Sequence, residues 1–257
     1  MSEAAAGAGD ADDQDAVSPG TGPAPRREEI RAALDAVERR VAAACAAAGR
    51  PRTEVSVVVV TKTFPASDVR LLAGLGVRDV GESRDQEAAP KAEDCADLDL
   101  SWHFVGRLQR NKAASVARYA CWVHSVDRSR LAGALSRGAQ AAGRDLEVLL
   151  QVSLDTDPDE AARRGGVAPD QVPALAAAVA AAPGLHLRGV MGVAPRGAAP
   201  RPAFDRLLEV SARLRQDHPD AGAVSAGMSG DLEEAVAAGA THLRVGSAVL
   251  GSRPPLQ

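Results

Sequence analysis

The sequence predicts a single α/β domain, a (β/α)8 barrel of the TIM type with one extra N-terminal helix. Short apolar runs typical of buried strands alternate with helical patterns, and such alternation indicates a parallel sheet with helical crossovers. Eight such units occupy roughly 200 residues, which suits a closed barrel. An open doubly wound sheet is the alternative, but it would normally carry a glycine-rich turn after its first strand. The segment that ends the first strand here, 61–65 (TKTFP), contains no glycine.

The extra helix is expected at 26–48, because apolar residues recur there at spacings of three and four. The strands are expected at 55–62, 79–83, 101–106, 121–126, 146–154, 185–193, 223–227 and 242–246. The helices between them are expected at 66–75, 84–95, 111–119, 128–142, 170–182, 201–217 and 231–238. In a barrel, strand residues alternate between the interior and the helices. If Lys62 faces the interior, Val58 and Val60 do too.

Residues 1–25 are predicted to be a disordered tail, and residues 26–257 to form the barrel. The tail is rich in Ala, Gly, Ser and Pro and carries several aspartates, but it lacks the basic start and apolar segment of a signal peptide. No stretch of the chain approaches 18 apolar residues without a charge, so no membrane span is expected.

Composition argues against several kinds of partner. Aromatic residues make up 2% of the chain and the net charge is −4, so neither single-stranded nucleic acid nor an anionic membrane is an expected partner. The three cysteines are far apart, with no CxxC pair, which favours a reducing compartment, the cytoplasm, over a disulfide framework. We expect a monomer without a metal site.

Lys62 is the first residue that indicates chemistry. It ends an apolar run in a chain where only three of the 30 basic residues are lysine. A lysine amine can lose its proton and attack a carbonyl, whereas an arginine guanidinium cannot. Active sites of such barrels gather at the carboxyl ends of the strands. We therefore predict a Schiff base with an aldehyde cofactor or a carbonyl substrate.

The loops after the last two strands predict a phosphate site. Ser229 and Gly230 precede the seventh expected helix, and Gly246 and Ser247 follow the last strand. Barrels often bind phosphate in these loops, where helix N-termini offer free N–H groups. Ser229 alone is also consistent with an ordinary N-cap. A phosphate site across the barrel mouth from Lys62 suits pyridoxal 5′-phosphate, whose aldehyde condenses with a lysine.

With these residues assembled, the chain resembles the pyridoxal phosphate homeostasis proteins, a family related to the N-terminal barrel of alanine racemase. The resemblance covers roughly residues 30–253. It is carried by VTKT (60–63), GES (81–83), WHFVG (102–106), LQ (108–109), NK (111–112), VHSVD (123–127), GVMG (189–192), GMS (227–229) and RVGS (244–247).

The resemblance implies a barrel that holds pyridoxal phosphate as an aldimine on Lys62. The cofactor contacts that it implies come from Lys62, Met228, Ser229, Arg244, Gly246 and Ser247. Arg244 matches the position that faces the pyridine nitrogen; from the residues alone, a surface or interface ion pair is equally open. A guanidinium only donates hydrogen bonds, so it keeps that nitrogen unprotonated and weakens the electron sink.

Ser83 and His103 complete the expected cofactor site. Ser83 stands where the family usually has asparagine, which removes an amide donor. His103 is expected on the third strand, either near the cofactor ring or as a buried structural histidine. His124, on the fourth strand, is a weaker instance of the same choice.

The resemblance implies a role in intracellular vitamin B6 homeostasis and supply of pyridoxal phosphate, with apo forms of pyridoxal-phosphate enzymes as acceptors and without robust turnover. The alternative is a weak pyridoxal-phosphate-dependent amino-acid racemase. Alanine racemases use a tyrosine from a partner subunit as second base, whereas the one tyrosine here, Tyr119, falls in a helical segment. A barrel aldolase for a phosphorylated sugar is a third hypothesis, and Glu82 is the only carboxylate expected near Lys62.

Overall fold

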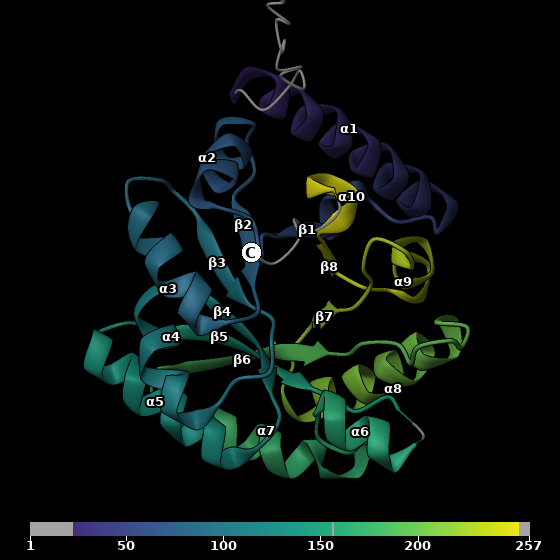
Figure 1. Cartoon of the computed structure of the whole chain (residues 1–257). Coiled ribbons are helices and arrows are strands. Elements are labelled where there is room, and N and C mark those ends of the chain that lie inside the picture. The colour runs from purple at the N-terminus through teal and green to yellow at the C-terminus, as the bar shows by residue number, and fades with distance from the viewer. Residues whose placement is uncertain (1–22, 156, 252–257) are drawn as a thin grey trace, which may run out of the picture.

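The computed structural model describes residues 23–155 and 157–251. Its eight strands close into a barrel in sequence order, and β1 pairs with β8 in parallel (Figure 1). The strands are β1 (Ser56–Val60), β2 (Asp79–Glu82), β3 (Ser101–Phe104), β4 (Trp122–Val126), β5 (Leu146–Gln151), β6 (Leu185–Met191), β7 (Ala223–Ser225) and β8 (His242–Val245). The predicted (β/α)8 barrel is confirmed.

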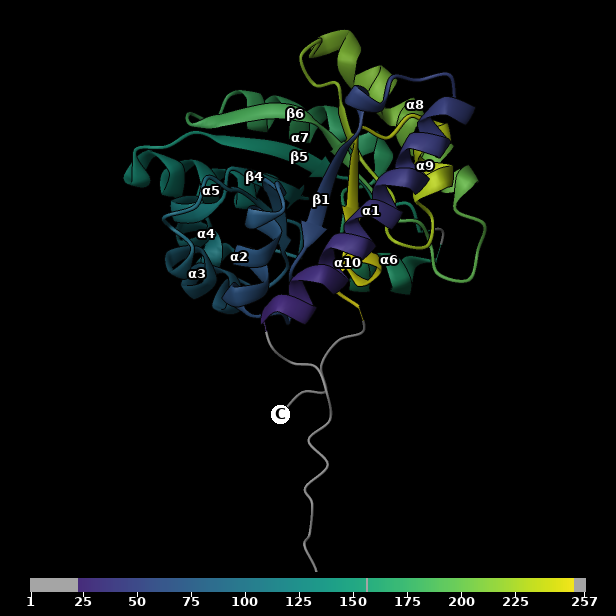
Figure 2. The same cartoon turned by 90° about the horizontal axis from the view of Figure 1, so that it is seen from above.

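Helices cover the outside of the barrel (Figures 1 and 2). They are α1 (Pro23–Ala47), α2 (Ala66–Gly74), α3 (Asp85–Asp94), α4 (Ala113–Tyr119), α5 (Ser129–Ala142), α6 (Pro158–Arg164), α7 (Val172–Ala180), α8 (Arg201–Asp217), α9 (Leu232–Ala238) and α10 (Ser247–Leu250). Short 3-10 turns lie at Arg52–Glu54, Arg110–Lys112 and Pro169–Gln171. In the described part of the chain, no helix combines the length and apolar character needed to cross a membrane.

Each predicted strand is present, but most of them end earlier than predicted. β1 ends at Val60, so Lys62 lies in a turn after the strand rather than at its last position. Apolar residues such as Val105 and Val193 continue beyond the strands because they line a cavity at the barrel mouth. Because the prediction followed the hydrophobic pattern, it placed the ends of these strands too far along the chain, in what are loops.

Two short helices, α6 and α10, were not expected from the sequence. α6 begins after Asp157, whose carboxylate accepts hydrogen bonds from the backbone N–H groups of Asp159 (2.8 Å) and Glu160 (3.3 Å). This is the side-chain cap that helix N-termini favour. α6 has seven residues and α10 has four, so neither is long enough to show a periodic apolar face in the sequence.

The N-terminal helix starts earlier than predicted. α1 begins at Pro23, so residues 23–25 belong to this helix and not to the predicted tail. The rest of the predicted tail, 1–22, lies outside the described residues.

α1 packs against α9 and α10, the helices that follow β7 and β8 (Figures 1 and 2). Its buried face includes Ile30, Val37 and Val41. Polar contacts reinforce this packing: Arg40 binds both carboxylate oxygens of Glu233 at 2.7 and 2.8 Å. The extra helix therefore supports the last two βα units of the barrel from outside.

Gly189 allows β6 to approach β7 closely. Its φ is +149°, and the register between β5 and β6 shifts immediately before Leu149 pairs with it. A Cβ atom at Gly189 would lie 1.9 Å from the carbonyl oxygen of Ala223 on β7. Only glycine fits there without moving one of the two strands.

We predict that Gly189→Ala lowers the free energy of unfolding by roughly 3 kcal/mol, because the backbone of β6 or β7 must shift. Chemical denaturation followed by circular dichroism measures the change. Gly222→Ala is the matched control, since nothing lies within 4 Å of a Cβ atom at that position. Equal stability of the two variants would contradict the close approach.

The amino-terminal end of the barrel interior contains an unusual group of aromatic and imidazole rings. His103, His124 and His242 pack around Trp122, whose ring stacks on that of His103 at a centroid distance of 5.7 Å. Burial, followed by the neighbouring His103 and Arg244, holds the pKa of His124 well below 6.5. Burial likewise lowers the pKa of His242 to about 4.

These two histidines should make the fold acid-sensitive. In the unfolded chain both titrate near pH 6.5, whereas in the fold both stay neutral to lower pH. Stability is therefore complete above pH 6.5 and falls below it, by about 1.4 kcal/mol per pH unit for each histidine. Urea unfolding between pH 7 and pH 5.5 measures the slope.

Two single variants test which histidines cause the pH dependence of the free energy of unfolding. His242→Asn should remove one histidine's share, while His186→Gln, with a side chain 48% exposed, should leave the slope as it is. A wild-type free energy of unfolding that stays constant over this pH range would disprove the assignment.

Candidate functional site

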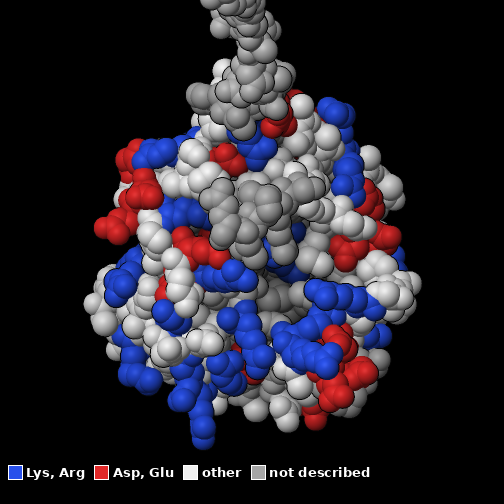
Figure 3. Space-filling view, viewed as in Figure 1, with Lys and Arg blue, Asp and Glu red and all other residues white. Residues whose placement is uncertain are grey.

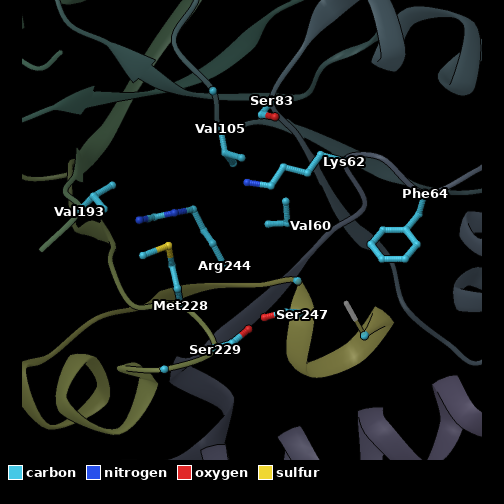
Figure 4. A pocket seen from close by; sticks show the side chains of 14 residues that line it. Val60, Lys62, Phe64, Ser83, Val105, Val193, Met228, Ser229, Arg244 and Ser247 are labelled. Atoms are coloured by element: carbon cyan, nitrogen blue, oxygen red, sulfur yellow. The ribbon is translucent and has the colours of Figure 1, made fainter. Parts of the chain in front are cut away.

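A cavity of about 480 Å³ opens at the carboxyl end of the barrel (Figure 4). Its lining comes from the carboxyl ends of β1 and β8 and from the segments that follow β1, β2, β3, β6, β7 and β8. The predicted site residues that line it are Lys62, Ser83, Met228, Ser229, Arg244, Gly246 and Ser247. His103 is not among the lining residues; its ring lies deeper in the barrel, 2% exposed.

The turn that carries Lys62 is held by α3. Lys91 on this helix donates from Nζ to the carbonyl oxygen of Thr61 at 2.9 Å. Glu87, one helical turn earlier, accepts from the backbone N–H of Thr63 at 3.1 Å. Thr63 has φ of +69°, a left-handed conformation that costs energy for a β-branched residue. Both neighbours of Lys62 are thus fixed to one helix.

Beneath this turn lies a buried ion pair that sequence reasoning did not identify. Glu82 is fully buried, and its Oε1 accepts from Lys91 Nζ at 2.5 Å and from Thr61 Oγ1 at 2.7 Å. The second carboxylate oxygen, Oε2, is buried and has no hydrogen-bond partner among the described residues, so Lys91 and Thr61 compensate the buried charge through one oxygen only. Separate signals in the sequence marked the two partners, since lysine is scarce in the chain and Glu82 was expected near Lys62, but nothing in it indicated that Lys91 and Glu82 pair.

Arg244 projects from β8 into the same cavity as Lys62, and both side chains point their nitrogens into it (Figure 4). Its Nη1 donates to Ser225 Oγ at 2.6 Å and its Nη2 to the carbonyl oxygen of Gly192 at 2.9 Å. Burial lowers the pKa of Arg244 to about 10, which leaves the guanidinium charged at neutral pH. It can therefore only donate a hydrogen bond to a group in the cavity.

The hydroxyls of Ser229 and Ser247 lie beside each other on the side of the cavity where α10 begins (Figure 4). Ser229 Oγ accepts from the backbone N–H of Ala248 at 3.2 Å, which joins the two loops. A Cβ atom at Gly246 would lie 3.2 Å from the carbonyl oxygen of Val60, so glycine permits close packing on β1. Hydroxyls and first-turn amides together can surround an anion.

The loop with Ser229 is also supported from behind by α1. Arg40 donates from Nη1 to the carbonyl oxygen of Ser229 at 3.0 Å. Near the other end of α1, Arg26 donates to the carbonyl oxygen of Leu250 at 3.0 Å, at the end of α10. The extra helix therefore contacts the loop with Ser229 and the far end of α10, the short helix that begins at Ser247.

Ser83 lines the cavity opposite these loops and depends on a glycine that sequence reasoning also missed. A Cβ atom at Gly106 would lie 2.1 Å from the carbonyl oxygen of Ser83. The chain after β3 can pass the chain after β2 only because Gly106 has no side chain. The WHFVG stretch contained this glycine, but nothing in its pattern indicated the contact.

Tyr119 lies outside the cavity, at the end of α4. Its hydroxyl donates to Asp85 Oδ1 at 3.5 Å, and burial raises its pKa above the usual value of 10. Among the described residues that line the cavity, none carries a carboxyl, imidazole or phenol group.

Basic side chains gather around the centre of the face seen in Figure 1, and acidic side chains lie mostly nearer its edges (Figure 3). Arg164 and Arg206 bind main-chain carbonyl groups near the ends of β5 and β6. A basic surrounding raises the local concentration of anions.

The cavity suits pyridoxal phosphate in the chemistry of its donors. It offers one lysine amine for an aldehyde, paired hydroxyls and amides for a phosphate, and a guanidinium for a ring nitrogen. Its volume lies within the range of small-ligand pockets.

Comparison with known proteins agrees with this assignment. A family model described as alanine racemase, N-terminal domain, matches residues 32–254. The pyridoxal phosphate homeostasis protein of Mycobacterium tuberculosis H37Rv is 47% identical over 247 residues, covering 89% of this chain and 94% of that protein. 

Solved structures show the same architecture. An unknown protein from Bifidobacterium adolescentis superposes with a TM-score of 0.80 at 29% identity, covering 87% of this chain and 95% of that one. PipY of Synechococcus elongatus PCC7942 with PLP bound gives a TM-score of 0.70 at 34% identity, covering 84% and 100%. The chain described here belongs to the alanine racemase N-terminal domain family, and within it to the pyridoxal phosphate homeostasis proteins.

Proposed function

We propose that this protein binds pyridoxal 5′-phosphate and serves in intracellular vitamin B6 homeostasis and cofactor supply. The observation that carries the proposal is the placement of Lys62 in one cavity with Arg244 and the paired hydroxyls of Ser229 and Ser247. The related PipY was solved with PLP bound, which supports the same ligand here.

In this proposal Lys62 supplies the amine for a reversible Schiff base with the cofactor aldehyde. Ser229, Gly246 and Ser247 bind the phosphate, and Arg244 donates to the pyridine nitrogen. Met228, which is 41% exposed, and Ser83 border the ring. His103 is not assigned a contact with the cofactor, because it is not among the residues that line the cavity and its ring bonds to His124 and Asp79.

Arg244 favours a carrier over a fast catalyst. When bound, pyridoxal phosphate supplies an electron sink for carbanions, and that sink is strongest when its ring nitrogen is protonated. A guanidinium has no proton to give at neutral pH and only donates a hydrogen bond. The described residues that line the cavity include no second acid or base; Tyr119 is hydrogen-bonded to Asp85 and Glu82 is paired with Lys91.

Delivery is the second half of the proposed role. Lys62 lies at an open mouth, where an amine of another molecule can displace it from the cofactor. Apo forms of pyridoxal-phosphate enzymes are the acceptors that we propose, with the protein acting as a monomer in the cytoplasm. The three cysteines, all unpaired, fit a reducing compartment.

Lys62→Ala should abolish the visible absorption of bound cofactor while the circular dichroism of the fold is unchanged, because the side chain lies at the mouth and not in the core. In the wild-type protein, borohydride reduction should fix a pyridoxyl group to the peptide that contains Lys62, as mass spectrometry detects. Lys112→Ala is the control, a lysine outside the cavity lining. A colourless wild-type protein, unchanged by added pyridoxal phosphate, would refute the proposal.

The racemase alternative makes a different prediction. Because the part of the lining that the structure describes contains no second base, purified protein loaded with pyridoxal phosphate should form no D-alanine or D-serine beyond the rate of free cofactor. Chiral chromatography of the amino acid after prolonged incubation measures this. Sustained turnover that disappears in Lys62→Ala would favour the racemase.

A further inference from the structure

A chain of hydrogen bonds crosses the barrel interior from the cavity to the opposite end. Arg244 Nη1 donates to Ser225 Oγ at 2.6 Å, and Ser225 Oγ lies 2.9 Å from His124 Nδ1. His124 Nε2 lies 2.9 Å from His103 Nδ1, and His103 Nε2 lies 2.9 Å from Asp79 Oδ1. The chain thus joins five side chains from β8, β7, β4, β3 and β2.

The two ends of this chain are chemically different. Arg244 is a donor at the cavity, whereas Asp79 is the first residue of β2 and its side chain is 37% exposed at the far end of the barrel. Between them, Ser225, His124 and His103 are almost completely buried. The chain is therefore a buried path between the cavity and solvent on the other side.

When both histidines are neutral, Arg244 at one end and Asp79 at the other determine which atom donates in every hydrogen bond of the chain. An ionised Asp79 accepts only, so His103 Nε2 carries a proton and His103 Nδ1 is an acceptor. His124 must then donate from Nε2, which leaves its Nδ1 to accept the hydroxyl proton of Ser225. Ser225 Oγ in turn accepts from Arg244, and all four bonds point from Arg244 toward Asp79.

This chain of hydrogen bonds explains how the fold tolerates the buried guanidinium of Arg244. Among residues 23–155 and 157–251, no carboxylate forms an ion pair with Arg244; the charge of Asp231 raises the pKa of Arg244, but burial outweighs it. A buried charge without compensation is costly. Aligned dipoles that end on a carboxylate stabilise the positive charge and hold the guanidinium plane in one orientation.

We propose that Ser225, His124, His103 and Asp79 form a proton-ordered relay that positions Arg244 in the cavity and couples it to the far end of the barrel. These four are positioning residues, and the role in cofactor binding rests on the proposed function. The titratable and charged groups that face the two central imidazoles are Asp79 on β2 and His242 and Arg244 on β8.

The first test uses the protein without cofactor, so it is independent of the proposed function. Long-range 1H–15N spectra near pH 7.5 report which ring nitrogen of each histidine is protonated, and the chain has only five histidines to assign. We expect protonated Nε2 and bare Nδ1 in both His103 and His124. A His124 protonated at Nδ1 would overturn the relay as drawn.

The second test acts at the far end, where substitution leaves the cavity intact. Asp79→Leu removes the final acceptor and should weaken pyridoxal phosphate binding about tenfold, the effect of losing one good hydrogen bond, and shift the pH profile of its visible absorption. Asp79→Asn keeps an acceptor oxygen and should retain wild-type affinity to within a few fold. Asp99→Leu is the control, an exposed carboxylate at the same end with 96% side-chain exposure.

Ser125→Ala provides a second control inside the barrel. Ser125 is buried beside His124, but its hydroxyl has no hydrogen-bond partner among the described residues, so its loss should change neither the histidine tautomers nor the absorption. Ser225→Ala, which breaks the relay, should change both. Wild-type tautomers and absorption in Asp79→Leu and Ser225→Ala would refute the relay; absence of cofactor binding in wild type would refute only the proposed function.

Discussion

The pairing of β1 with β8 is the constraint on which the site depends. It places Val58 opposite Arg244 and Val59 opposite Val245, so segments from the two ends of the barrel become neighbours. The turn with Lys62 then leaves β1 on the same side as the turn with Gly246 and Ser247 leaves β8. Without this closure, the amine and the guanidinium would not share a cavity.

Closure of the barrel also explains why the charge of Arg244 lies in its interior. A barrel interior is filled by side chains from alternate positions of all strands, and here the layers below the cavity contain imidazoles, a hydroxyl and a guanidinium rather than aliphatic groups alone. The ion pair of Glu82 and Lys91 lies beside this interior and serves the turn of Lys62. Polar groups are thus concentrated around the site, while strand residues such as Val123 and Leu150 pack with helix residues such as Leu131 in the apolar core.

The sequence was sufficient for the fold and for most of the cavity, because both follow from local patterns. Strand and helix alternation predicted the barrel, and residues at strand ends, such as Lys62 and Ser229, were predicted to meet at its mouth. Contacts between distant side chains leave no such pattern. For His103 the sequence left open a place near the cofactor or a buried structural role, and its ring bonds to His124 and Asp79. The support that Lys91 gives to Thr61 likewise depends on the orientation of α3.

The position of α1 links the stability of the cavity loops to the docking of the first helix of the barrel domain. Arg40 and Arg26 donate hydrogen bonds to the carbonyl groups of Ser229 and Leu250, so docking of this helix stabilises the loop with Ser229 and the end of α10. By thermodynamic reciprocity, a ligand that tightens the loops also tightens the docking of α1. The outermost helix thereby contributes to the energetics of ligand retention, although none of the residues described for it lines the cavity.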